Sequence, residues 1–159
     1  MSTSLNGFSV IILGTDVEHF RNGEHNYYSL SHLSEYYIKL VNNRPTKCHA
    51  KVFIEGNSVG TWRIKAFSNI TLERQVNINK KFVFIEKSNA DERAKYNNGL
   101  INVIFKPENI KLKHRNLYIL DNMYHSQFAK ADQFDTHTEP PSIDIDNITI
   151  INLRLVLKR

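Results

Sequence analysis

The feature that most constrains the fold is a continuous run of short β-type segments between Glu35 and Lys106. The segments read EYYIKLVN, CHAKVFIE, SVGTWRIK, SNITLERQ, KKFVFIEK and LINVIFKP, and Gly, Asn, Pro or charged residues separate them. Each is rich in β-branched and aromatic residues, which is typical of strands in antiparallel all-β domains. The run therefore predicts an antiparallel β-sandwich, jelly-roll-like, with about eight strands.

Alternation within these segments predicts which side chains face the core. Tyr36, Ile38 and Leu40 share one face of their segment because successive side chains of a strand point to opposite faces. The pair Gly56-Asn57 separates two alternating runs and predicts a two-residue hairpin turn, and Gly60 is expected to mark a bulge or to make room for an aromatic ring. The segment 82–85 is apolar on both faces, so we expect a central or covered strand there.

The flanking regions are less regular. Phe8–Leu13 predicts a first strand, and residues 14–34 read as a loop region with room for a short strand near Tyr27–Leu30. The segment Ser88–Tyr96 predicts a short helix in a crossover loop. One domain, residues 1–159, would contain a core motif region (36–106), an irregular excursion (107–147) and an apolar terminal strand (148–157). We expect this strand to be interior to a sheet or to form an interface, and it could complete a neighbouring subunit by strand addition.

Composition limits the classes of function. The chain has 159 residues, a net charge of +5 and a pI of about 9.3, which is basic but lacks the dense stripe of a dedicated nucleic-acid binder. A nucleic acid is therefore the less favoured partner. Cys48 is the only cysteine, so no intrachain disulfide forms and we expect a buried thiol. No apolar run is long enough to span a bilayer, and the first residues lack the basic region of a signal peptide, so we expect neither.

Motifs of catalysis and of cofactor binding do not stand out in the sequence. We find no P-loop, no G-x-S-x-G and no G-x-G-x-x-G, and none of the seven histidines forms a tight metal-binding pair. We therefore expect no cofactor and no metal, and we read Asp144 and Asp146 as a solvated charge pair. The long loops leave one enzyme hypothesis open, in which His19, His25 and Asp144 provide the chemistry.

Charged and aromatic residues interleave within the predicted strands, and this pattern has two interpretations. The functional one is a basic, aromatic-bearing sheet face that contacts an acidic protein, a glycan or a nucleic acid. Its ligand- or partner-binding residues would be Trp62, Arg63, Arg74, Arg44 and Tyr37. In the other, these residues lie on the polar face of an antiparallel sheet, where Arg63 or Arg74 pairs with Glu73 or Glu55 across strands.

Several longer motifs stand in a fixed order between Tyr37 and Glu108: NNR-x-TKCHA from Asn42, GTWRI from Gly60, ITLER from Ile70, KFVF from Lys81 and NGLINVIFKPE from Asn98. In these motifs the chain resembles a group of small, mostly uncharacterised β-rich proteins of giant DNA viruses, with relatives in some bacteria. It departs from their pattern at Val41, Glu55 and Gln75. The resemblance implies a β-sandwich module that is a component of a virion.

These features lead to an expected function without catalysis. The chain would be a structural or accessory protein, associated with the virion or capsid of a large DNA virus, that acts through protein–protein interfaces. Its partners would be copies of itself or capsid proteins, and its location the virion or the host cytoplasm. The alternative is a ligand-binding module that recognises a glycan or an acidic partner through the aromatic and basic sheet face.

Overall fold

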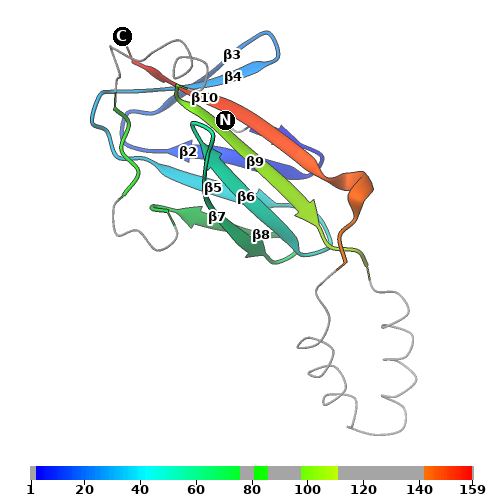
Figure 1. Cartoon of the computed structure of the whole chain (residues 1–159). Coiled ribbons are helices and arrows are strands. Elements are labelled where there is room, and N and C mark those ends of the chain that lie inside the picture. Colours follow the sequence, from blue (N-terminus) through cyan, green and yellow to red (C-terminus); the bar gives the residue numbers. More distant parts are fainter. Residues whose placement is uncertain (1–2, 76–80, 86–97, 111–141, 159) are drawn as a thin grey trace, which may run out of the picture.

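The chain folds as a β-sandwich of two stacked sheets (Figure 1). In the computed structural model, the described residues are 3–75, 81–85, 98–110 and 142–158. They form ten strands and one short 3-10 helix, η1 (Ile145–Asn147). The predicted sandwich is confirmed, with ten strands where the sequence predicts about eight.

The smaller sheet has four strands and is antiparallel throughout. Its order is β1 (Thr3–Leu5), β2 (Phe8–Leu13), β5 (Tyr37–Asn42) and β8 (Ser68–Leu72). The sequence prediction misses β1, although Asn6 and Gly7 carry the signature of a hairpin turn. Both residues have positive φ, +53° and +83°, which suits a two-residue turn between β1 and β2.

The larger sheet has six strands, and one of its pairs is parallel. Its order is β3 (Glu18–Asn22), β4 (His25–Leu30), β10 (Thr149–Leu157), β9 (Leu100–Pro107), β6 (Cys48–Ile54) and β7 (Asn57–Ile64). Strand β4 pairs with β10 in parallel, so the prediction of a wholly antiparallel sandwich is wrong at this position. The two strands are far apart in sequence and no hairpin joins them, so nothing local imposes antiparallel pairing.

Strand β10 is interior, as the apolar pattern predicts. It pairs with β9 along one edge and, from Arg154 to Leu157, with β4 along the other, so β10 is not an edge strand of the sheet. Ile151, Leu153 and Leu155 are buried, as are Tyr36, Ile38 and Leu40 on β5 and just before it. These inward side chains fill the core between the sheets, where the rings of Phe8 and Phe105 stack with centroids 4.5 Å apart.

The hairpin of β6 and β7 differs from its prediction by one residue. Ile54 pairs with Asn57, so the turn residues are Glu55 and Gly56, with φ of +51° and +83°, and not Gly56 and Asn57. Both positive values fit a type I′ turn, whose twist matches the flanking strands. The register shifts between Val52 and Phe53, opposite Gly60, which confirms the predicted bulge.

Two further segments differ from their predictions. Within residues 14–34, the short strand expected near Tyr27–Leu30 is confirmed as β4, but β3, which forms a hairpin with it, lies where a loop was expected. Phe82–Ile85 is not a central strand, because it makes only isolated bridges and Ile85 is half exposed. It runs beside residues 33–36, where Tyr36 N donates to Phe82 O at 3.1 Å, and Phe82 alone of the four is buried.

The predicted helix Ser88–Tyr96 lies outside the described residues, as does most of the predicted excursion, residues 111–141. The two described ends of that excursion meet. Glu108 forms a bridge with Ile143, and Asn109 N donates to Ser142 O at 2.9 Å.

Candidate functional site

The outer face of the six-stranded sheet gathers polar, charged and apolar side chains in rows that the strand register defines. One row crosses four strands as Thr61, Lys51, Ile104 and Ile150. The next row toward the start of β9 contains Ser58, Phe53, Asn102 and Asn152. The row on the other side contains Arg63, His49 and Lys106. Since register partners in antiparallel strands project to the same side, these residues share one surface.

A cluster of charged side chains, which we call the ion cluster, lies at one end of this face, where β9 ends. The Glu108 carboxylate follows β9, and its side chain is only 10% exposed. Arg63 Nε and Nη2 donate to its two oxygens at 2.8 and 2.9 Å, and His49 Nε2 lies 2.9 Å from Oε2. Such a bidentate arginine–carboxylate pair fixes geometry as well as charge. The cluster joins β6, β7 and the end of β9.

The cluster also sets the titration of its members. Burial alone would raise the pKa of Glu108, but the hydrogen bonds and charge of Arg63, followed by His49, lower it below its ordinary value. The same hydrogen bonds raise the pKa of Arg63. Beneath the cluster, burial and then the charge of Glu108 raise the pKa of the Cys48 thiol to about 12. Glu108 therefore stays ionised and Cys48 stays a neutral thiol at neutral pH.

A buried amide supports the same end from inside. Asn42 is fully buried at the end of β5 and donates to Thr46 O at 2.9 Å, to Lys65 O at 3.1 Å and to Ile64 O at 3.3 Å. Its Oδ1 accepts a hydrogen bond from Arg44 N at 3.1 Å. This one side chain links the turn between β5 and β6 to the end of β7, because it donates hydrogen bonds to backbone carbonyls of both segments.

Exposed isoleucines lie where β10 begins. Ile145, Ile148 and Ile150 are 77%, 37% and 52% exposed, and Ile150 pairs in register with the half-buried Ile104 of β9. We call these four residues the isoleucine patch. Two exposed lysines adjoin it, Lys51 beside Ile104 and Lys106 two residues further along β9. Exposed apolar groups concentrated in this way mark surfaces that bind other molecules.

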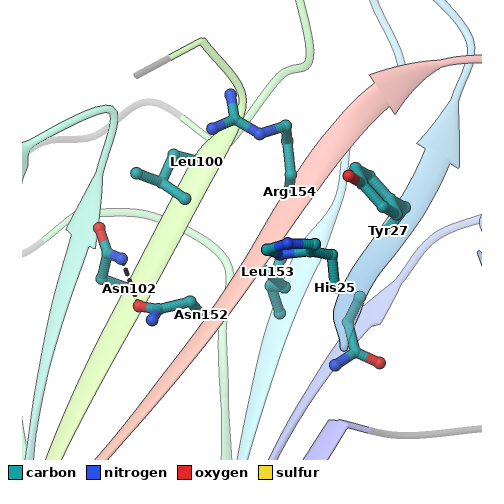
Figure 2. A pocket seen from close by; sticks show the side chains of 8 residues that line it. His25, Tyr27, Leu100, Asn102, Asn152, Leu153 and Arg154 are labelled. Carbon is teal, nitrogen blue, oxygen red and sulfur yellow. Dashed lines mark hydrogen bonds between the residues drawn. The ribbon is translucent and has the colours of Figure 1, made fainter. Parts of the chain in front are cut away.

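A shallow hollow of about 280 Å³ opens near the other end of the outer face (Figure 2). We call it the amide hollow; its lining comes from β4, β9 and β10 and consists of His25, Asn26, Tyr27, Leu100, Asn102, Asn152, Leu153 and Arg154. Figure 2 shows His25 and Tyr27 on β4 beside Arg154 of β10, with Asn102 and Asn152 joined by a hydrogen bond. Asn102 Nδ2 is the donor and Asn152 Oδ1 the acceptor.

The hollow lies where strands β4 and β10 are no longer paired. Strands β4 and β10 pair over only four residues, from Tyr27 with Arg154 to Leu30 with Leu157. Before Tyr27, β4 continues in its hairpin with β3 and no longer pairs with β10. Leu153, which faces the core and is almost fully buried, lies beneath the space between the strands.

The predicted binding residues do not come together on one surface. Trp62 pairs with the buried Ala50 and packs, half-buried, against the core. Arg63 follows it and points to the outer face, into the ion cluster. Neighbouring residues of a strand face opposite sides, so Trp62 and Arg63 cannot form one aromatic and basic surface.

The other three predicted residues lie elsewhere. Arg44 Nη1 donates to Asn6 O at 3.1 Å and to Asn6 Oδ1 at 3.0 Å, which fastens the β1–β2 turn to the loop after β5. Arg74 Nη2 pairs with its neighbour Glu73 at 2.7 Å. Tyr37 is half-buried at the start of β5, on the outer face of the four-stranded sheet.

The residues of the enzyme hypothesis are also separated. His19 stacks on Tyr28 with centroids 4.6 Å apart, and its Nε2 lies 3.0 Å from Asn26 Oδ1. His25 lines the hollow near the start of β9, whereas Asp144 N donates to Pro107 O at its far end. The Asp144 carboxylate accepts a hydrogen bond from Asn147 Nδ2 at 2.7 Å. The described residues thus do not bring these three side chains to one site.

Among the residues that the structure describes, no three His, Cys, Asp or Glu side chains converge as ligands for a metal ion. Within those ranges, no helix is long and apolar enough to cross a membrane.

Comparison with protein families, with curated protein sequences and with solved structures finds no match for this chain.

Sequence reasoning missed Glu108 and the two asparagines of the hollow. Glu108 stands in the FKPE motif and Arg63 in GTWRI, so the order of motifs contained both partners without indicating that they meet. Asn102 and Asn152 each interrupt an apolar strand with an amide, and this shared irregularity was the available signal. Pairing them requires the register of β9 and β10, which no local pattern supplies.

Proposed function

We propose that this chain is a non-enzymatic structural or accessory β-sandwich that acts through protein–protein contacts. The observation that carries the proposal is the isoleucine patch, of which Ile104 and Ile150 lie on the outer face of the six-stranded sheet. The opposite face of that sheet is buried against the four-stranded sheet, so the outer face is the one available to a partner. Apolar side chains at the centre of a surface, with charged residues around them, are the usual anatomy of an interface.

The chemistry of the patch defines the partner. Ile150 and Ile104 offer apolar contact on two adjacent strands, and Lys51 and Lys106 place positive charge beside them. A partner surface with apolar side chains and flanking carboxylates would be complementary. Burial of a half-exposed isoleucine stabilises a complex by roughly 1 kcal/mol, and the lysines contribute more to orientation and association rate than to affinity.

The ion cluster supports a role without catalysis. The Glu108 carboxylate accepts two hydrogen bonds from Arg63 and contacts His49, so three of its roughly four acceptor positions are engaged within the fold. A carboxylate that acts as a general base has to reach a substrate proton. We interpret this cluster as a structural contact that stabilises the packing of β6, β7 and the end of β9.

The biological setting is part of the proposal. We propose that the protein is associated with the virion or capsid of a large DNA virus, and that its partners are further copies of itself or capsid proteins. The support for this setting is the resemblance of residues 37–108 to β-rich proteins of such viruses, together with a sandwich fold of the kind found in capsid domains.

The native mass of the protein in solution tests self-association. We expect light scattering at low and high ionic strength to give the same closed oligomer, since an apolar interface resists salt. The variant Ile150→Asp should dissociate it, and Thr71→Asp, an exposed strand position on the other sheet, should not. A monomer at both ionic strengths would contradict self-association through this patch.

The second candidate function is ligand binding, and the amide hollow is the observation that favours it. The residues that the sequence suggested for this role are dispersed, whereas the hollow brings an aromatic ring, amides and an apolar floor together.

A further inference from the structure

We infer that the amide hollow is a binding site for a neutral saccharide. Two rows of side chains frame it across three strands. Tyr27, Arg154 and Leu100 form one row by register, and Asn152 with Asn102 forms the next. His25, two residues before Tyr27, extends the second row on β4. The rows create a surface with an apolar base and polar edges.

This combination matches the two-sided chemistry of a sugar ring. A pyranose has a face of C–H groups and an edge of hydroxyls. Leu100 offers apolar contact at the base of the hollow, above the buried Leu153, and Tyr27 adds an aromatic ring. Aromatic side chains combine a large apolar surface with a polar handle, which suits such a ligand. The volume of about 280 Å³ falls at the small end of ligand sites and suits a single sugar unit.

The two amides offer the hydrogen bonds that hydroxyls require. Asn102 Nδ2 donates to Asn152 Oδ1, and this bond orients both side chains. Among the described residues, no second hydrogen bond engages either amide. Both Asn152 N–H groups and Asn102 Oδ1 are therefore available in the hollow. A hydroxyl both donates and accepts, and a fixed pair of amides presents both functions side by side.

The guanidinium in the wall of the hollow is engaged within the fold. Arg154 Nη1 donates to Asn98 O at 2.6 Å, so this end of the side chain is held by the loop before β9. An arginine that clamps a carboxylate presents its fork to the ligand. Here the Arg154 side chain lines the hollow in a position that its hydrogen bond to Asn98 O fixes.

The site is preorganised by the sheet. Tyr27 stacks on Phe20 with centroids 5.2 Å apart, which holds the ring in place. Leu155 N donates to Gly99 O at 2.8 Å just beside the hollow. Gly99 has a φ of +73°, and a Cβ there would lie 2.1 Å from Leu155 O, so only glycine permits this close approach. Preorganised groups lose little entropy when a ligand binds.

A glycan array followed by NMR titration tests the inference. We expect the purified protein to bind at least one neutral oligosaccharide on an array of neutral and acidic glycans. The strongest neutral binder is then titrated up to about 10 mM, where even a Kd of about 1 mM fills most sites. Backbone amide signals of Tyr27, Asn102 and Asn152 should shift.

The decisive variant is Asn152→Asp. A carboxylate at this position still accepts the hydrogen bond from Asn102 Nδ2, so the strand contact is retained while two donors are lost. We expect binding to weaken at least about tenfold, which corresponds to the loss of a hydrogen bond or more. Asn69→Asp, an exposed strand asparagine on the outer face of the other sheet, adds the same charge and should leave affinity unchanged.

A second variant, Tyr27→Leu, keeps an apolar side chain in the strand and removes the ring, and it should weaken binding likewise. The inference is overturned if no neutral glycan binds, if acidic glycans are preferred, or if both variants bind within twofold of the unaltered protein. These variants leave the isoleucine patch intact, so their outcome is independent of the test by light scattering.

Discussion

The two ends of one sheet face use polar residues in opposite ways. At the ion cluster, Glu108 is shielded from solvent and its oxygens are taken by Arg63 and His49. At the amide hollow, Asn102 and Asn152 share one hydrogen bond and keep further donors and acceptors exposed. A polar group whose bonds are all made within the fold contributes to stability, whereas one with bonds left over is available to a ligand. The ion cluster thus uses its polar groups within the fold, whereas the amide hollow has polar groups left over.

The largest effect is expected for the reactivity of Cys48, which reports whether the ion-cluster end stays closed. The thiol is fully buried, and its pKa is raised to about 12, first by burial and then by Glu108. Since thiolate is the reactive species, we expect labelling by Ellman's reagent at pH 8 to be about a thousandfold slower than in the unfolded chain. Similar rates in buffer and in guanidinium chloride would show that this end opens readily.

The variant Asn42→Ala tests the buried support of the same end. It removes the hydrogen bonds that Asn42 Nδ2 shares among three backbone carbonyls, of which that to Ile64 O is buried, and the bond that its Oδ1 accepts. We expect the free energy of unfolding to fall by about 3 kcal/mol, measured by urea denaturation. Asn43→Ala is the matched control, because its side chain is exposed, and it should change stability by less than about 0.5 kcal/mol. If both variants lower the free energy of unfolding equally, the Asn42 side chain does not stabilise this end of the sheet.

The variant Glu108→Gln tests the cluster itself and should cost about 1–2 kcal/mol at pH 7, with the value reduced because Arg63 is half exposed. The pKa of Glu108 is lowered in the folded state, so the carboxylate stabilises the fold above its ordinary value of 4.5. That stabilisation is lost as the pH falls through the lowered pKa. The free energy of unfolding of Glu108→Gln should therefore depend less on pH, between 4.5 and the lowered pKa of Glu108, than that of the unaltered protein.

Glu73→Gln is the control for this prediction. Glu73 and Arg74 form an exposed pair, so its loss should change stability by less than about 0.5 kcal/mol. If Glu73→Gln and Glu108→Gln lower stability equally, the cluster has no special role.

The smallest effect is expected at the other end. Asn152→Asp keeps the hydrogen bond with Asn102 and lies at an exposed position, so unfolding should change by no more than about 0.5 kcal/mol. Thermal unfolding of the variant beside Glu108→Gln gives a direct comparison of the two ends. A loss of more than about 1 kcal/mol would mean that the amide pair is structural and that the contrast between the ends fails.

Local patterns predicted the fold well where the controlling interactions are local. The alternation of Tyr36, Ile38 and Leu40 placed all three in the core, since period-2 spacing directly determines the buried face. The β6–β7 turn was displaced by one residue because Glu55 adopts positive φ, which few residues other than Gly and Asn do readily. The β6–β7 hairpin was therefore predicted correctly, but its turn residues were predicted one position too late.

The candidate sites depend on pairings that a single sequence does not encode locally. Arg63 and Glu108 meet only because β6 lies between β7 and β9, and Asn102 meets Asn152 only through the register of β9 with β10. The predicted grouping of Trp62 with Arg63 on one surface could have been excluded from the sequence alone. Strand alternation places adjacent residues on opposite faces. Sequence patterns thus determined which residues face outward more reliably than which outward residues are neighbours.

The interior position of β10 has a consequence for the order in which the molecule assembles. Residues 149–157 fill the gap between β4 and β9, so the hairpin of β3 and β4 cannot join the larger sheet until they arrive. The sheet is completed by contacts between distant parts of the chain, and topologies of this kind fold slowly, in milliseconds to seconds. During synthesis the larger sheet therefore cannot close until residues 149–157 have emerged from the ribosome, after all of its other strands.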